Sequence, residues 1–194
     1  NISEAEQPVP YWDIHGMAEI KKHSPIPIMA DESVHTPEQA RIVCQHDAAD
    51  ILNIKFMKCG GIYKALQISD IAAEYGFTST QVVSWNLELA TLDIARTLKK
   101  RAADNGVRLT AIWGGCTGPQ EWNFTKGPVT LGLVPSAYRA MRVLELKKWA
   151  DFAVEAGAPA VITHCGFLPE NMTDPSFEEV LVAIQDVAGY CKQL

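Results

Sequence analysis

Residues 51–61 read ILNIKFMKCGG, and this stretch sets the pattern from which the fold of the chain is predicted. A short apolar, β-branched run ends in the polar residue Lys55, and two glycines then precede a helical pattern over residues 62–75. An apolar run bounded by turn residues and followed by helical periodicity is typical of a buried strand that leads into a helix. The stretch therefore predicts one strand–helix unit.

The same unit recurs along the 194 residues. Strands are expected at residues 1–6, 26–31, 51–55, 81–85, 108–113 and 160–164, and helices at residues 11–22, 37–46, 62–75, 88–104, 137–156 and 176–192. Strands that alternate with helices at about thirty residues per unit indicate a parallel sheet. No strand is followed by Gly-x-Gly-x-x-Gly, which removes the usual marker of an open nucleotide-binding sheet.

Polar residues at successive strand ends are typical of barrel enzymes, whose sites form at that edge. We therefore expect an α/β protein of one domain, residues 1–194, with six parallel βα units in consecutive order. A complete barrel has eight such units, so the fold is predicted as a partial or altered (βα) barrel. Unpaired edge strands favour pairing with another chain, and a homo-oligomer is therefore expected.

Composition and net charge limit the kinds of molecule that the chain is expected to bind. The chain is 47% hydrophobic and 21% charged, with a net charge of −6. The negative charge argues against a nucleic-acid surface, and no apolar run is long enough for a membrane span. The five cysteines form no Cys-x-x-Cys pair, and the chain starts without a basic-then-apolar leader. Reduced thiols in a cytoplasmic protein with a small-molecule ligand are the expectation.

Three polar residues stand at the ends of the first three strands: Glu6, Asp31 and Lys55. Mg²⁺ prefers carboxylate oxygens, and a nearby cation disfavours the charged form of a lysine, which can then act as a base. The three residues are therefore candidates for a cation site with an acid/base group. The alternative is that they are ordinary polar residues at strand ends.

The sequence motifs around these three residues favour a cation site with an acid/base group. EQP at residues 6–8, MADES at 29–33 and NIKFMKCGGI at 53–62 occur in this order. Residues 1–76 closely resemble the enolase superfamily, in its muconate-lactonising and dipeptide-epimerase subgroup. The resemblance implies that Glu6 and Asp31 bind Mg²⁺, that Glu32 supports the ligands, and that Lys55 exchanges a proton with the carbon next to a substrate carboxylate. It places a third acidic ligand and an opposing lysine before Asn1, so we expect weak Mg²⁺ binding.

The remainder of the chain resembles another family. The resemblance is carried by the motifs LTAIWGG at residues 109–115 and THCGFLPEN at residues 163–171. Residues 74–194 resemble sugar phosphate isomerases/epimerases of the xylose-isomerase-like type. The resemblance implies that Trp85, Trp113 and His164 line a sugar-binding wall, whereas that family's metal ligands would follow Leu194. Core or rim packing of the tryptophans and a structural role for the histidine are the alternatives.

The two resemblances meet inside the helix that ends near Gly76. Residues 1–76 and 77–194 are therefore expected to be enolase-like and sugar-isomerase-like parts of one recombined or designed chimera with no evolved catalytic activity. Two alternatives stay open. One is residual Mg²⁺-dependent α-proton abstraction by the first part, and the other is sugar or sugar-phosphate binding by the second.

Overall fold

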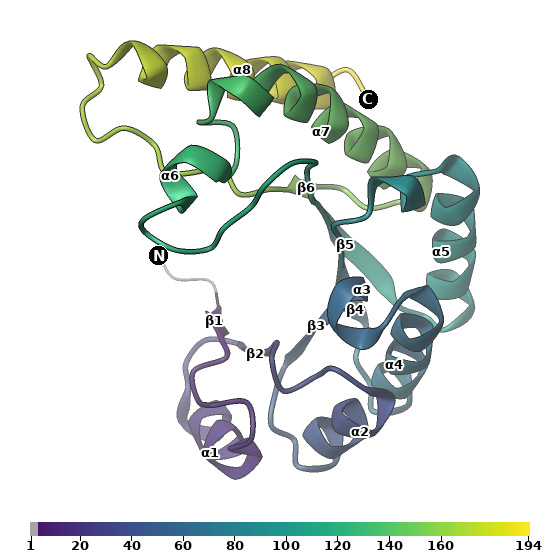
Figure 1. Ribbon diagram of the computed structural model, residues 1–194. Helices are drawn as coiled ribbons and strands as arrows, with labels where there is room; N and C mark the ends of the chain where they lie inside the picture. Colours follow the sequence, from purple (N-terminus) through teal and green to yellow (C-terminus); the bar gives the residue numbers. More distant parts are fainter. Residues whose placement is uncertain (1–3) are drawn as a thin grey trace. The chain divides into compact units, whose positions relative to one another are not determined.

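A computed structural model describes residues 4–194, so the first three residues of the predicted strand 1–6 lie outside the described residues. Six strands form one sheet in the order β1-β2-β3-β4-β5-β6, and the alternation of strands and helices can be followed in Figure 1. The strands are β1 (Ala5–Glu6), β2 (Ile28–Ala30), β3 (Ile51–Lys55), β4 (Ser79–Ser84), β5 (Arg108–Gly114) and β6 (Val161–Ile162). The pairing is parallel, for example with Glu6 opposite Met29. The predicted class of consecutive parallel βα units is confirmed.

All six predicted long helices are present. They are α1 (Ile14–His23), α2 (Pro37–Gln45), α4 (Ile62–Glu74), α5 (Leu92–Asp104), α7 (Ser136–Ala156) and α8 (Pro175–Cys191). Three short elements had no sequence signal: α3 (Phe56–Cys59), α6 (Gly127–Thr130) and the 3₁₀ turn η1 (Leu87–Leu89). None of the helices within residues 4–194 has both the length and the apolar character needed to cross a membrane.

Capping residues explain where the helices begin and end. Thr36 precedes α2, and its hydroxyl accepts a hydrogen bond from the Gln39 backbone N–H at 3.2 Å. The Gln39 side chain reaches back to the His35 N–H at 2.8 Å, just before the N-cap, so hydrogen bonds in both directions fix the start of α2. Gly157 ends α7 with a φ of 77°, a left-handed conformation that favours glycine.

The described chain forms two compact units, and the first comprises residues 4–83 and 97–111. Its core lies where the strands meet helices α2 and α4, which pack side by side (Figure 1). The largest fully buried side chains of this core are Met17, Ile28, Val34, Val43, Leu52 and Ile68. A small apolar cavity of about 20 Å³ remains between α4, α5 and strands β3 to β5, with Leu66 on its wall.

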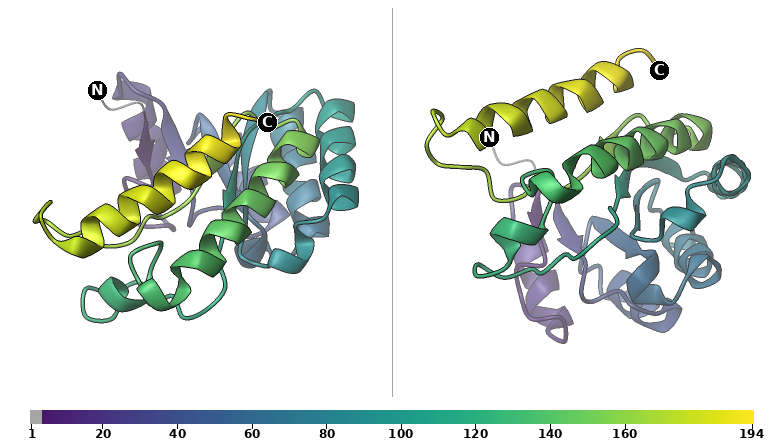
Figure 2. Two further views of the ribbon diagram at one scale, coloured as in Figure 1. Left: turned by 90° about the horizontal axis from the view of Figure 1, so that it is seen from above. Right: turned by 45° about the horizontal axis from the view of Figure 1, so that its top comes forward.

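The second unit comprises residues 84–96 and 112–194. Its core lies between α7 and α8, which run alongside each other in Figure 2. The buried residues there are Leu133, Val143, Leu146, Val180 and Ala183. Polar contacts reinforce this packing, because Tyr190 donates to Asp151 at 2.7 Å and Lys147 donates to Asp186 at 2.8 Å.

One buried arginine orders the long segment that follows β5. The Arg142 side chain on α7 is fully buried and donates four hydrogen bonds to backbone carbonyls of this segment. The acceptors are the carbonyl oxygens of Thr117 (3.1 Å), Pro119 (3.0 Å), Thr130 (2.7 Å) and Gly132 (2.7 Å). This segment, residues 116–135, contains the short helix α6 and is held at one point by the Arg142 guanidinium. The guanidinium can do this because it presents several donors in a rigid plane.

Two glycines at the end of β5 let tryptophans approach the backbone. A Cβ atom on Gly114 would lie 2.3 Å from the Trp149 ring, and one on Gly115 would lie 2.7 Å from the Cα atom of Trp85. Neither distance is possible between real atoms, so both positions require glycine while Trp149 and Trp85 occupy these places. Trp149 is also fixed by its indole N–H, which donates to the Gly115 carbonyl at 2.9 Å.

Candidate active site

The three residues predicted at the first strand ends come together within the first unit. Lys55, the last residue of β3, donates from Nζ to Asp31 Oδ2, and its Nζ lies 3.8 Å from Glu6 Oε1. Asp31 directly follows β2, and Glu6 is the last residue of β1. Neighbouring parallel strands present their carboxyl ends at one edge, and this topology explains why residues far apart in sequence meet.

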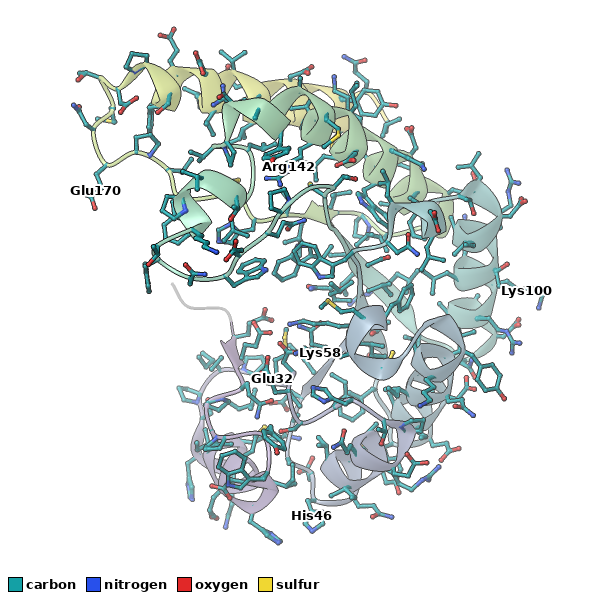
Figure 3. The ribbon with its side chains drawn as sticks, in the orientation of Figure 1. Glu32, His46, Lys58, Lys100, Arg142 and Glu170 are labelled. Carbon is teal, nitrogen blue, oxygen red and sulfur yellow. The ribbon has the colours of Figure 1, made fainter. Side chains whose placement is uncertain are left out.

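Two further residues complete this cluster and were not assigned a role from the sequence. Lys58, on the short helix α3, donates to Asp31 Oδ1 at 2.6 Å and to Glu32 Oε1 at 2.9 Å, and Figure 3 shows Lys58 and Glu32 close together. Asn53 is buried and donates from Nδ2 to Glu6 Oε1 at 3.1 Å. Asn53 lies two residues before Lys55 on the same strand face, a spacing that could have indicated it.

Gln7 holds the ends of β1 and β2 together. Its side-chain oxygen accepts from the backbone N–H groups of Asp31 at 2.9 Å and Ser33 at 3.2 Å, and its amide nitrogen donates to the Ser33 hydroxyl at 2.9 Å. Gln7 has a φ of 42°, which is uncommon for a residue other than glycine. The turn after Glu6 therefore places the Gln7 side-chain amide within hydrogen-bonding distance of the backbone at Asp31 and Ser33.

The two carboxyl groups have pKa values displaced in opposite directions. Burial raises the pKa of Glu6, and the hydrogen bond and charge of Asp31 add to this effect. Burial also opposes ionisation of Asp31, but the hydrogen bonds from Glu6, Lys55 and Lys58 outweigh it and lower the pKa of that carboxyl. The ionised Asp31 is thus the anionic centre of the cluster, with Glu6 beside it as the group that retains a proton more readily.

The chemistry of the donors fits a hard divalent cation. Glu6 and Asp31 supply carboxylate oxygens, and Asn53 Oδ1 is a buried oxygen for which no hydrogen-bond partner is found within residues 4–194. The ammonium groups of Lys55 and Lys58 both contact Asp31, so the surroundings of this carboxylate favour a positive charge. In the described part of the chain, no group of three or more His, Cys, Asp or Glu side chains is arranged to hold a metal. Within residues 4–194, the protein oxygens that this cluster offers to a cation are therefore the carboxylates of Glu6 and Asp31 and the Asn53 Oδ1 atom.

The residues predicted to bind a sugar lie in the second unit. The rings of Trp85 and Trp113 have centroids 6.3 Å apart. His164 reaches this pair through Trp122, whose ring lies 5.8 Å from Trp85 and 5.0 Å from His164. We call these four residues the aromatic cluster. Trp122 belongs to the segment after β5 and was not assigned a role from the sequence. Its place in a long segment between two strands is the signal that could have indicated it.

The polar character of the aromatic cluster comes from His164. Its Nδ1 accepts a hydrogen bond from the Gly166 N–H at 3.0 Å, so the neutral ring carries its proton on Nε2. An N–H beside indole rings could hydrogen-bond a hydroxyl group of a ligand stacked on them. Glu170, by contrast, is exposed on the loop before α8, and Figure 3 shows it at the outer end of that loop.

The fold and the first site define a protein of the barrel-type α/β class with a carboxylate–lysine centre at its strand ends. A family model described as enolase C-terminal domain-like matches residues 1–130. The chain therefore belongs to the enolase C-terminal domain-like family. The match continues beyond Gly76, and the division of the chain into residues 1–76 and 77–194 stays a prediction.

Comparison with individual proteins agrees with this family. The chain is 45% identical over 75 residues to the L-Ala-D/L-Glu epimerase of Clostridium acetobutylicum, covering 39% of this chain and 21% of that protein. It is 32% identical over 121 residues to the hydrophobic dipeptide epimerase of Enterococcus faecalis, covering 61% of this chain and 34% of that protein. The chain thus spans about a fifth to a third of the length of these relatives.

Among solved structures, a xylose isomerase domain protein from Planctomyces limnophilus is similar, with a TM-score of 0.60 and 30% identity. The similarity covers 64% of this chain and 45% of that protein. Both resemblances seen in the sequence are therefore confirmed, the second through this barrel protein.

The expectation of a chain with no evolved catalytic activity is wrong. The relatives are named epimerases, and the family match includes the strands that carry Glu6, Asp31 and Lys55. The prediction of inactivity rests on the small number of βα units. That number does not determine whether the groups at three adjacent strand ends keep their contacts. The alternative of α-proton abstraction has the better support.

Proposed function

We propose that the chain supplies the centre of an epimerase- or racemase-type site, which removes and returns a proton at a carbon next to a carboxylate. The observation that carries the proposal is the meeting of Glu6, Asp31 and Lys55 at neighbouring strand ends. The names of the two epimerase relatives support the reaction class and suggest a dipeptide as substrate.

Each residue has a distinct role in this proposal. Glu6 and Asp31 hold a divalent cation such as Mg²⁺, which when bound would neutralise the substrate carboxylate and make the adjacent C–H bond more acidic. Lys55 would act as a neutral amine, after its ammonium group has released one proton to solvent. It takes the α-proton on Nζ while the electron pair of the broken C–H bond spreads into the carboxylate, and it later returns a proton to the carbon. Asp31 keeps the amino group in place through the hydrogen bond from Nζ.

The test is exchange of the α-proton in deuterated water. The full chain is incubated with L-Ala-L-Glu and Mg²⁺, and loss of the α-proton signals is followed by NMR. We expect Mg²⁺-dependent exchange that Lys55→Ala reduces by about 10²–10⁴-fold, the usual contribution of a positioned acid/base group. Lys100→Ala, an exposed lysine on α5, is the matched control and should leave the rate unchanged. Equal rates for the two variants would refute the role of Lys55.

A second candidate function rests on the aromatic cluster. The four rings come from the residue after β4, from β5, and from the segments after β5 and β6. They form one continuous set of contacts and provide flat surfaces for a sugar ring with one N–H donor. Similarity to the xylose isomerase domain protein supports a sugar or sugar phosphate as ligand. Titration with xylose and with xylulose 5-phosphate, followed by tryptophan fluorescence, should show saturable binding that Trp85→Ala abolishes.

A further inference from the structure

We propose that Lys58 is a positioning residue that neutralises Asp31 while no metal is bound and passes its ammonium group to Glu32 when a divalent cation binds. The inference rests on the proposed function, because it concerns the same carboxylates. Its basis is a single geometric fact. Lys58 Nζ lies 2.6 Å from Asp31 Oδ1 and 2.9 Å from Glu32 Oε1, so one amino group already bridges the carboxylates of two consecutive residues.

The contacts of Asp31 show why one lysine has to leave. Lys55 holds Oδ2, Lys58 holds Oδ1, and the Asp31 side chain is only 3% exposed. A cation that binds Asp31 through one of these oxygens meets an ammonium group at contact distance, and the repulsion between the two positive charges favours displacement of that group. Lys55 has to remain in the site for proton transfer, which leaves Lys58 as the group that gives way.

The position of Lys58 makes such a shift possible. It lies on the four-residue helix α3, and its side chain is 19% exposed, so solvent reaches part of it. Glu32, its second partner, is 48% exposed and lies close to Lys58 in Figure 3. After leaving Asp31, the ammonium group would keep an ionic partner without crossing the protein interior, and this limits the cost of the exchange.

The proposal makes metal affinity a competition between Lys58 and the cation. Without the lysine, Asp31 Oδ1 is available from the start, and binding should be tighter. Without Glu32, Lys58 has Asp31 as its carboxylate partner in this cluster, and binding should be weaker. Long-range electrostatics alone predicts the same directions of change in metal affinity for the two substitutions. A transfer of Lys58 from Asp31 to Glu32 differs from such a general charge effect, because it makes the effect of changing Glu32 depend on the presence of Lys58.

The experiment is a double-mutant cycle for Mn²⁺ binding to the full chain, measured by electron paramagnetic resonance at fixed pH and ionic strength. We expect Lys58→Met to tighten binding by about tenfold, as removal of one adjacent positive charge would. Glu32→Gln should weaken binding in the wild-type background and have little effect in the Lys58→Met background. Lys100→Met removes the same charge from the exposed surface of α5 and should change affinity less than about twofold.

Three results would overturn the inference. They are unchanged affinity in Lys58→Met, a Glu32→Gln effect of equal size in both backgrounds, and the absence of Mn²⁺ binding in both wild type and Lys58→Met. The first two leave the proposed function intact if Asp31→Asn abolishes Mn²⁺ binding and α-proton exchange still depends on Lys55. Failure of the proposed function is recognised separately, by exchange that does not depend on Lys55.

Discussion

Replacement of Arg142 by methionine should destabilise the second unit more than any surface change. Methionine matches much of the length and volume of the side chain but has no donor. Four backbone carbonyls of residues 117–132 then lose their partner, since Arg142 donates to each of them in the native structure. Its helix position and its packing against the Tyr138 ring, whose centroid is 4.9 Å from the guanidinium carbon, can largely be kept by methionine.

The size of the effect follows from two opposing contributions. Each buried carbonyl left without a donor costs about 1–3 kcal/mol. Burial lowers the pKa of Arg142, which shows that its charge is desolvated. Removing that charge recovers several kcal/mol. We expect a net loss of about 3–5 kcal/mol in the free energy of unfolding, because the cost of four carbonyls without a donor exceeds the recovered desolvation energy.

Urea denaturation followed by tryptophan fluorescence measures this loss. Four of the five tryptophans lie in the second unit, at positions 85, 113, 122 and 149, so the signal reports mainly on that unit. Arg96→Met is the matched control, because Arg96 is an exposed arginine of the same unit, and it should leave the midpoint nearly unchanged. The reasoning fails if the two variants have the same midpoint, or if trypsin cleaves the segment after β5 no faster in Arg142→Met than in wild type.

Four other outcomes follow from the structure. Asp31→Asn should cost about 3–5 kcal/mol in the free energy of unfolding at pH 7. Because the pKa of Asp31 is lowered, the carboxylate stabilises the fold above its ordinary pKa of 3.8, and this stabilisation is lost as the pH falls through the folded-state pKa. The urea midpoints of wild type and variant should therefore converge in acid. Leu66→Ala enlarges the cavity of the first unit and should cost about 2–3 kcal/mol in urea denaturation followed by circular dichroism, which reports on the helices of the first unit as well. Ile162→Lys places a charge on strand β6, the last in the strand order, and should reduce any dimer seen by light scattering. A thiol reagent at pH 8 should modify the exposed Cys191 first and Cys116 slowly, since burial raises the pKa of Cys116 to about 11.

The helices and strands were predictable because their signals are local. Thr36 and Gly157 mark helix ends through bonds made within a few residues, and the apolar run 51–54 needs no distant partner to be recognised. The bounds of the long helices accordingly differ from prediction by only a few residues. Helices α3 and α6 have four residues each, too few for a periodic pattern to emerge.

The site was predictable to the extent that strand order decides it. Glu6, Asp31 and Lys55 each end a strand, and consecutive parallel order brings those ends together. The roles of Lys58 and Arg142 could not be predicted in this way. Each depends on a side chain that reaches across tertiary space, to a carboxylate in one case and to loop carbonyls in the other, and a sequence does not state such distances.

The two glycines at the end of β5 leave very different routes open to evolution. Around Gly114 the obstructing atoms all belong to the side chain of Trp149, so a second change at position 149, together with a shift of a few tenths of an ångström, could in principle accommodate alanine there. Around Gly115 the main chain of Trp85 itself is in the way. No partner substitution moves a Cα atom. Position 114 can therefore change only in step with position 149, and position 115 is closed to any side chain for as long as strands β4 and β5 keep their present approach.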